Sequence, residues 1–156
     1  MTGGGTDNYA VIGHHGEVAS VGSSVGISNR ILVDVDGNAA LSSGNGVLGQ
    51  AQIGHVGFGE GTVVLGGDVN LLANSLTLTG GNAANGTAQV GHLSRTEGAS
   101  LGGAINVTTN GDLTLQAGSS GQTEAIIGHD SQEIDLVTSS GNISVCLLYT
   151  SDAADE

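Results

Sequence analysis

The stretch "AQIGH" at residues 51–55 decides the fold, because near-copies of it recur along the chain. The other copies are "AVIGH" at 10–14, "AQVGH" at 88–92 and "AIIGH" at 125–129. Their first residues are 41, 37 and 37 positions apart. A recurring period of this length is typical of a solenoid, in which each repeat is one unit that stacks on the next. The sequence therefore predicts four repeats, which start near residues 10, 51, 88 and 125.

Two further short segments follow each copy, and they alternate apolar and polar residues as a strand with one buried face does. They are "VDV" (33–35) and "AAL" (39–41), "VNL" (69–71) and "LTL" (76–78), "INV" (105–107) and "LTL" (113–115), and "IDL" (134–136) and "ISV" (143–145). No helical stripe of apolar residues is long enough to compete with this pattern. We predict an all-β, right-handed parallel β-helix (β-solenoid) with about four repeats of about 37 residues and three short strands each.

The stretch between each histidine and the next predicted strand varies in length. It covers residues 15–32, 56–68, 93–104 and 130–133 in the four copies. A solenoid tolerates such variation at a decorated corner, so we expect these stretches to be excursions. The short fourth stretch favours one coil per repeat, although longer excursions that form coils of their own are an alternative.

The composition narrows the choice of partners. The 156 residues include 29 glycines, no proline and no lysine, and the net charge is −13. Nucleic acid and anionic membranes are recognised by clustered Lys and Arg, so we expect neither as a partner. No apolar run approaches the ~18 residues that cross a bilayer, so we expect no direct membrane insertion.

Residues 146–156, "CLLYTSDAADE", differ from everything before them. They resemble the translation of a transposase-type sequencing adapter, and segments of that origin are set aside in fold reasoning. We therefore expect a β-solenoid segment at residues 1–145, which is a fragment of a longer protein, and a non-native tail at 146–156. Without the tail the chain has no cysteine, and 12 acidic residues against Arg30 and Arg95 give a net charge of −10.

The repeats "GDVNLLANSLTLTGG" (67–81) and "GAINVTTNGDLTLQAGSSG" (103–121), together with the recurring "IGH", resemble bacterial large exoproteins of the filamentous-haemagglutinin type. The resemblance covers residues 7–145. It implies a secreted or cell-surface fibre, used for adhesion or as the stalk of a contact-dependent toxin. It also implies an outer-membrane transporter partner of the two-partner secretion route, and a receptor or glycan on host or bacterial cells.

The recurring histidines have two possible roles, a metal or proton site and a structural ladder. In a strand His55 shares a face with Ala51 and Ile53, whereas Gln52 and Gly54 point outward. Zinc needs ligand atoms ~2.0–2.1 Å from the metal, and side chains in single file ~4.8 Å apart do not converge on one ion. We expect neutral, core-facing imidazoles with lowered pKa values, and glycines that allow the bend. The predicted ladder comprises His14, His55, His92, His129, Gly13, Gly54, Gly91 and Gly128. We expect the extra His15 to be solvated.

Acidic residues offer two further candidates. Asp68 and Asp112 lie beside glycines, where Ca²⁺ coordination and ordinary turn hydrogen bonding compete, and the turn role is favoured. A polysaccharide-acting enzyme needs cations or a defined carboxylate pair, and the chain offers only two arginines and the unrepeated pair Asp34 and Asp36. We expect no catalytic residue, no metal and no cofactor. The alternative to a structural or adhesive fibre is a solenoid that binds Ca²⁺ or carbohydrate.

Overall fold

The fold consists of short β-strands. The computed structural model describes residues 1–3, 9–132 and 136–148 of the chain. Within these ranges there are seventeen strands, from β1 to β17. The same residues contain no helix with the length and hydropathy that a membrane crossing requires.

The strands form four parallel sheets, numbered here in the order in which each turn of chain visits them. Sheet I contains β1 (Tyr9–Ile12), β6 (Gln50–Ile53), β10 (Thr87–Val90) and β14 (Glu124–Ile127). Sheet II contains β2 (His15–Val18), β3 (Ser24–Ile27), β7 (Val56–Leu65), β11 (Leu93–Leu101), β15 (Asp130–Ser131) and β16 (Leu136–Ser139). Sheet III contains β4 (Ile31–Asp34), β8 (Val69–Ala73), β12 (Ile105–Thr109) and β17 (Ile143–Leu147). Sheet IV contains β5 (Asn38–Ser42), β9 (Ser75–Thr79) and β13 (Leu113–Gln116).

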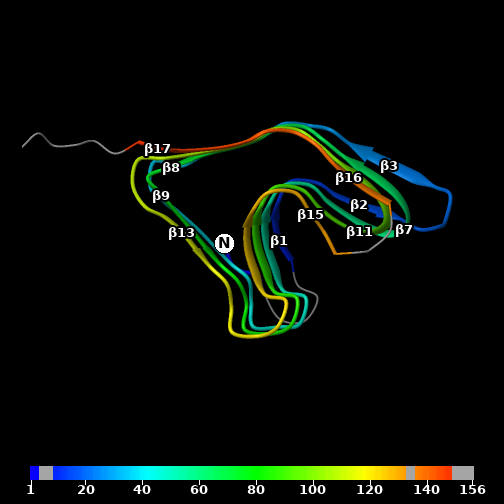
Figure 1. The fold of residues 1–156 in the computed structure, drawn as a ribbon, viewed down its shortest axis with the longest axis horizontal. Helices are drawn as coiled ribbons and strands as arrows, with labels where there is room; N and C mark the ends of the chain where they lie inside the picture. Colours follow the sequence, from blue (N-terminus) through cyan, green and yellow to red (C-terminus); the bar gives the residue numbers. More distant parts are fainter. Residues whose placement is uncertain (4–8, 133–135, 149–156) are drawn as a thin grey trace, which may run out of the picture.

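Each repeat is one coil, and equivalent residues of successive repeats are hydrogen-bonded neighbours. Ala51 pairs with Ala10 on one side and with Ala88 on the other. In Figure 1 the coils lie one behind another, from blue to red. The predicted parallel β-solenoid of about four turns is thus confirmed, with one coil per repeat. Each turn also passes through sheet II, which the expectation of three strands left out.

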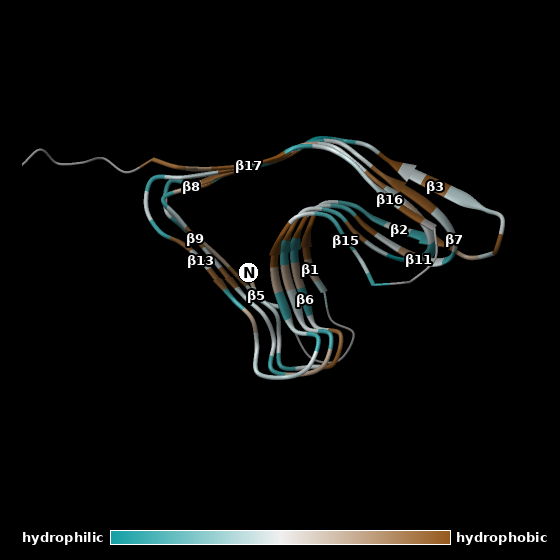
Figure 2. Ribbon diagram, viewed as in Figure 1, coloured by the Kyte–Doolittle hydropathy of each residue, from teal (hydrophilic) through white to brown (hydrophobic). Residues whose placement is uncertain are grey.

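The main core lies between sheets I, III and IV. Its buried members are small or branched aliphatic residues because the side chains of stacked coils share a narrow column. They are Ile31, Leu41, Ala51, Ile53, Val69, Leu71, Leu76, Leu78, Ala88, Val90, Ile105 and Val107. Figure 2 shows the hydrophobic segments that follow the strands around this column.

Sheet II folds back on itself and has two limbs. The first limb comprises β2, β15 and the first parts of β7 and β11, and the second comprises β3, β16 and the later parts of β7 and β11. A second, smaller core lies between the two limbs. Val63, Leu65 and Leu101 belong to this cluster, which packs against the first limb of the sheet. Gly57 lies on that limb, and a Cβ there would come 2.7 Å from Val63 Cγ2. The two limbs therefore approach closely only because the first limb carries glycine at this point.

One predicted strand of the first turn is wrong in register. In the first turn β4 starts at Ile31, which pairs with Val69, so "ILV" rather than "VDV" is the equivalent of "VNL". A shift of two residues keeps every side chain on the same face, so alternation does not reveal it.

The fourth turn departs further from the prediction. Residues 134 and 135 of "IDL" lie outside the described residues, and Leu136 begins β16, which pairs with β11 in sheet II. "ISV" (143–145) pairs with "INV" (105–107) and therefore belongs to sheet III, not sheet IV. All the strands alternate with the same period, so only pairing with the preceding turn assigns a strand to its sheet.

The expected corner excursions are also wrong. In the observed register, the stretch between the histidine and sheet III has a similar length in all four turns. It covers residues 15–30, 56–68, 93–104 and 130–142. The stretches contain the strands of sheet II, so they extend the coil rather than decorate it.

Candidate functional site

The four histidines of the "IGH" copies form a column along the stack. The His55 and His92 rings are parallel within 4° with centroids 4.9 Å apart, and the His92 and His129 rings are 4.9 Å apart at 13°. His14 meets His55 at 5.1 Å with a tilt of 49°. His55 and His92 are fully buried, His129 is half-buried and His14 is exposed. His14, in the first turn, stands in the same column, but its side chain is exposed rather than buried.

Hydrogen bonds fix the tautomer of the three later rings. The backbone N–H of His55 donates to His92 Nδ1 at 3.0 Å, and the same contact joins His14 to His55 and His92 to His129, each at 3.2 Å. On the other side, Nε2 lies 2.7–3.1 Å from a backbone carbonyl oxygen, that of Asn29, Gly67 or Gly103. A carbonyl only accepts, so Nε2 carries the proton and each ring is neutral. In a regular parallel sheet each backbone N–H donates to a backbone carbonyl of the neighbouring strand. At this bend the histidine N–H donates instead to the imidazole Nδ1 of the next turn.

Burial keeps these rings uncharged. Burial is the main reason why the pKa of His92 is lowered to about 4. The neighbouring His129 and His55 lower this pKa further, whereas the hydrogen bond to the Gly67 carbonyl raises it. Burial is also the main cause of the lowered pKa values of His55 and His129. A proton added at Nδ1 would face the backbone N–H that now donates there, so charging the ring also breaks a hydrogen bond.

The glycines of the "IGH" copies let successive coils approach closely. A Cβ on Gly13, Gly54 or Gly91 would overlap the carbonyl oxygen of the equivalent glycine in the next turn, which for Gly91 is Gly128. No side chain larger than hydrogen fits without moving the backbone. The histidine column and the glycine bend are thus parts of one corner.

Gln52 and Gln89 complete this corner. Gln52 points away from the core as expected, but its side chain is buried rather than exposed to solvent. Both glutamines lie on the face of sheet I opposite to the core, but both are fully buried. Gln52 Nε2 donates to the carbonyl oxygens of Gly91 and His55, at 2.7 and 3.1 Å. Gln89 makes the equivalent bonds to Gly128 and His92. Alternation predicts the face correctly, but it does not predict that the first limb of sheet II covers that face.

The rings of His55, His92 and His129 have no free lone pair for a metal ion. Each of the three later rings uses its Nδ1 lone pair for a backbone N–H and its Nε2 proton for a carbonyl. A metal would have to displace these bonds, and rings 4.9 Å apart in parallel do not aim at one point. Among the described residues no group of three or more His, Cys, Asp or Glu side chains has a metal-binding arrangement.

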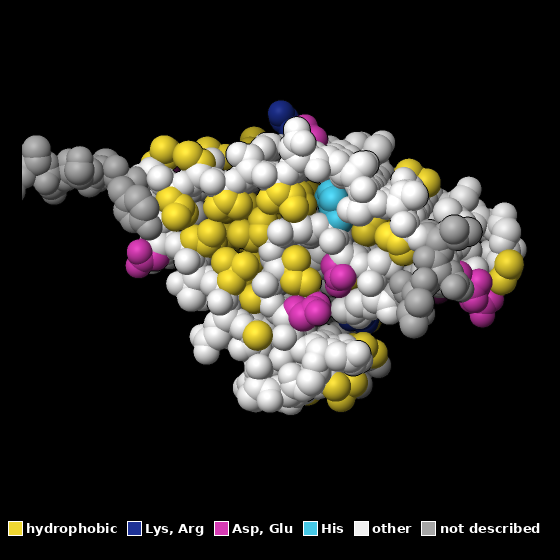
Figure 3. Space-filling view, in the orientation of Figure 1, with side chains coloured by type: hydrophobic (Ala, Val, Ile, Leu, Met, Phe, Trp, Pro, Cys, Tyr) yellow, Lys and Arg dark blue, Asp and Glu magenta, His cyan; other side chains and the backbone are white. Residues whose placement is uncertain are grey.

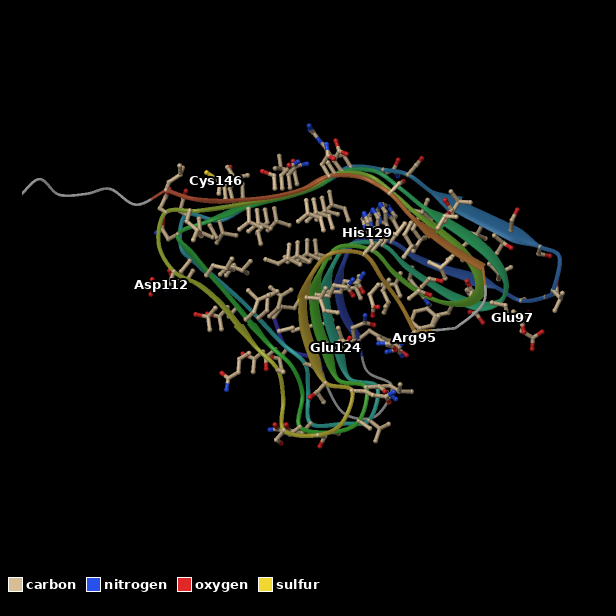
Figure 4. All side chains as sticks on the ribbon, in the orientation of Figure 1. Arg95, Glu97, Asp112, Glu124, His129 and Cys146 are labelled. Atoms are coloured by element: carbon tan, nitrogen blue, oxygen red, sulfur yellow. The ribbon has the colours of Figure 1, made fainter. Side chains whose placement is uncertain are left out.

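A groove opens beside the column, between the outer face of sheet I and the first limb of sheet II. It has a volume of about 510 Å³ near β14 and β15. Its polar lining includes Arg95, Glu124, Asp130 and Gln132. In Figure 4 Glu124 of β14 and Arg95 of β11 lie on the two sides of this space, whereas Glu97 lies farther out along sheet II.

Both carboxyl groups in the groove are held toward the neutral form. Burial raises the pKa of Asp130, although the Ser131 backbone and the positive charge of Arg95 act in the opposite direction. Burial and the negative charge of Asp130 raise the pKa of Glu124. Desolvation is the largest cause of both shifts, so this part of the groove penalises a buried negative charge.

The other sequence candidates stand apart from this region. Asp68 Oδ1 accepts a hydrogen bond from the backbone N–H of Ala104 at 2.9 Å, which is a turn contact between successive coils. Asp34, Asp36, Asp112 and Arg30 are exposed. His15 is exposed as expected, and its ring meets Phe58 edge-on at 4.8 Å.

Sequence reasoning missed the groove residues. Arg95, Glu124, Asp130 and Gln132 do not recur at equal positions in the four copies, so the repeat pattern does not reveal them. One available signal was the glutamine shared by "AQIGH" and "AQVGH", which marks a polar position inside the structure.

Comparison of the chain with protein-family models, curated proteins and solved structures gives no match.

Proposed function

We propose that this solenoid is a non-catalytic structural segment of a secreted bacterial surface fibre. The proposal follows the resemblance to exoproteins of the filamentous-haemagglutinin type, which implies an adhesin or a toxin stalk that an outer-membrane transporter exports. Its strongest support is the parallel pairing of equivalent residues in successive turns. The paired residues are 37 positions apart in β6 and β10 of sheet I and in the first part of β11, and 36 apart beyond the register shift between Thr96 and Gly98. A stack of this kind adds length in equal steps, and a spacer requires this property.

The end face at β13, β14 and β17 adds further support. Ile143 and Val145 pair with the buried Ile105 and Val107 and occupy the same core column, yet they are 55% and 43% exposed. Figure 3 shows the resulting hydrophobic area in the middle of this face. Burial of such side chains contributes ~1.5–3 kcal/mol each, so a further coil of the same shape would be stabilised there.

Duplication of two turns tests the spacer role. A second copy of residues 51–124 inserted after Glu124 keeps the register, because Glu124 and Gln50 occupy equivalent positions. We expect the particle to lengthen by about 10 Å, which is two coil spacings, without a lower melting temperature. Small-angle X-ray scattering and circular dichroism measure the two quantities.

A shuffled insert of the same composition serves as the control, and it should add disordered chain without strand signal. If the duplicated turns behave like the shuffled insert, the stack does not extend and the spacer role is refuted.

Antibody labelling tests the proposed location. Antibodies raised against the solenoid should label intact cells of the source bacterium or its culture medium, because a surface fibre is accessible without permeabilisation. Labelling that appears only after permeabilisation, with a cytoplasmic marker as reference, would contradict export.

A further inference from the structure

Among the described residues, three of the five buried side-chain atoms without a hydrogen-bond partner belong to residues that line the groove; the other two are Gln50 Oε1 and Gln89 Oε1. Arg95 Nε and Nη2 and Asp130 Oδ2 are buried from solvent, and none of them has a hydrogen-bond partner. An unpaired buried polar group costs ~1–3 kcal/mol, and more when it is charged. Two donors and one acceptor in the same groove therefore favour a ligand that both accepts and donates hydrogen bonds.

Tyr9 and Phe58 hold the Arg95 guanidinium in place without occupying its Nε and Nη2 atoms. The guanidinium lies 5.7 Å from the ring centroids of both Tyr9 and Phe58, and Nη1 donates to the Tyr9 hydroxyl at 3.3 Å. Contacts with aromatic faces restrict the orientation of a guanidinium. Nε and Nη2 are thus held without using up their hydrogen-bonding capacity.

The opposite rim is formed by three equivalent turn residues. Leu48, Asn85 and Gln122 line the groove, and they share a left-handed backbone with φ of 60°, 60° and 59°. Such a conformation costs a residue with a side chain roughly 1 kcal/mol. Its recurrence in three successive turns places a side chain of each turn at the rim, among them two carboxamides.

The charged side chains of the groove limit which ligands can bind there. An anion would approach Arg95 but would also face Glu124 and Asp130, so the groove disfavours it. A neutral molecule with several hydroxyl groups meets both requirements, because each hydroxyl accepts from Arg95 and donates to Asp130. The volume of about 510 Å³ lies within the range of small-ligand pockets.

We propose that the groove lined by Arg95, Glu124, Asp130 and Gln132 binds a neutral, hydroxyl-rich ligand, such as an uncharged sugar residue of a glycan. This site does not depend on the spacer role, since a stack of any length can carry it.

Sugar binding by the intact chain tests the site. The probes are D-galactose, D-mannose, N-acetyl-D-glucosamine and lactose as neutral sugars, with N-acetylneuraminic acid as the anionic comparison. We expect at least one neutral sugar to bind with a Kd below about 10 mM and to shift the NMR signals of Arg95 and Asp130, whereas the anionic sugar binds at least tenfold more weakly.

Two variants and a control localise the binding. Asp130→Asn and Arg95→Gln should each weaken the neutral sugar at least tenfold, because each removes a charged partner of the ligand. Glu97→Gln removes an exposed carboxylate from the same strand as Arg95 and should leave Kd unchanged. Circular dichroism checks the fold of each variant, and Asp130→Asn decides alone if Arg95→Gln does not fold.

Three results would overturn the proposal: no neutral sugar binding below about 10 mM, undiminished binding by Asp130→Asn, or preference for N-acetylneuraminic acid. None of them bears on the length measured for the duplicated stack, so the two proposals fail separately.

Discussion

Replacement of Gly91 by alanine is expected to lower the free energy of unfolding by about 4 kcal/mol, from overpacking together with backbone strain. The alanine Cβ would overlap the carbonyl oxygen of Gly128 and approach Ile105 Cδ1 at 3.0 Å. Neither neighbour is free to move, because the Gly128 N–H is bonded to Val90 O at 2.9 Å and Ile105 is fully buried. The φ of +141° adds strain for any residue with a side chain. Equilibrium unfolding in urea, followed by circular dichroism, measures the loss.

Gly26→Ala is the matched control. Gly26 lies in β3, and a Cβ there would meet nothing within 4 Å. We expect a change within about 0.5 kcal/mol of the wild type. Equal effects of the two substitutions would show that the coils are not packed at the glycine corner as described.

Stability is also expected to fall as the pH drops from 7.5 to 5, through the histidine column. The pKa of His92 is about 4 in the folded protein and 6.5 as an ordinary value, so the unfolded chain binds more protons between these limits. The contribution of His92 is therefore fully present above pH 6.5 and is lost progressively as the pH falls toward 4. For this residue alone the loss at pH 5 is about 2 kcal/mol. His55 and His129 act in the same direction.

Glu124 and Asp130 act in the opposite direction. Their pKa values are raised above 4.5 and 3.8, so their contribution is present at low pH and is lost as the pH rises through the folded values. A comparison with a His variant cancels this carboxyl contribution, because the carboxyl groups stay in place.

His92→Gln is the variant that isolates the imidazole. Unfolding midpoints at pH 5 and 7.5 should differ less in His92→Gln than in the wild type, and least when all four ladder histidines are replaced by Gln. The same pH dependence in the wild type and in the fourfold variant would refute the buried neutral column.

Much of the fold was predictable because the period is repeated in the residues themselves. Ala51, Ile53 and His55 return 37 positions later as Ala88, Val90 and His92, and the pairing of equal positions follows from that recurrence. The neutral, single-file geometry of the histidines follows from the strand period and the coil spacing.

The groove was not predictable in the same way. Arg95, Glu124 and Asp130 are single residues at positions whose equivalents are Phe58, Thr87 and Leu93. Nothing repeated marks them, and they share a space only because sheet II folds back along the outer face of sheet I.

The sequence by itself therefore determined the coil, its period and the residues at its tightest corner, since these depend on local alternation and on glycine where no side chain fits. Only the tertiary structure decided which sheet each strand joins, which polar residues are buried, and that Arg95 and Asp130 line the same groove. These outcomes depend on contacts between segments that are distant in the chain, and a strand period of two residues is the same in every sheet.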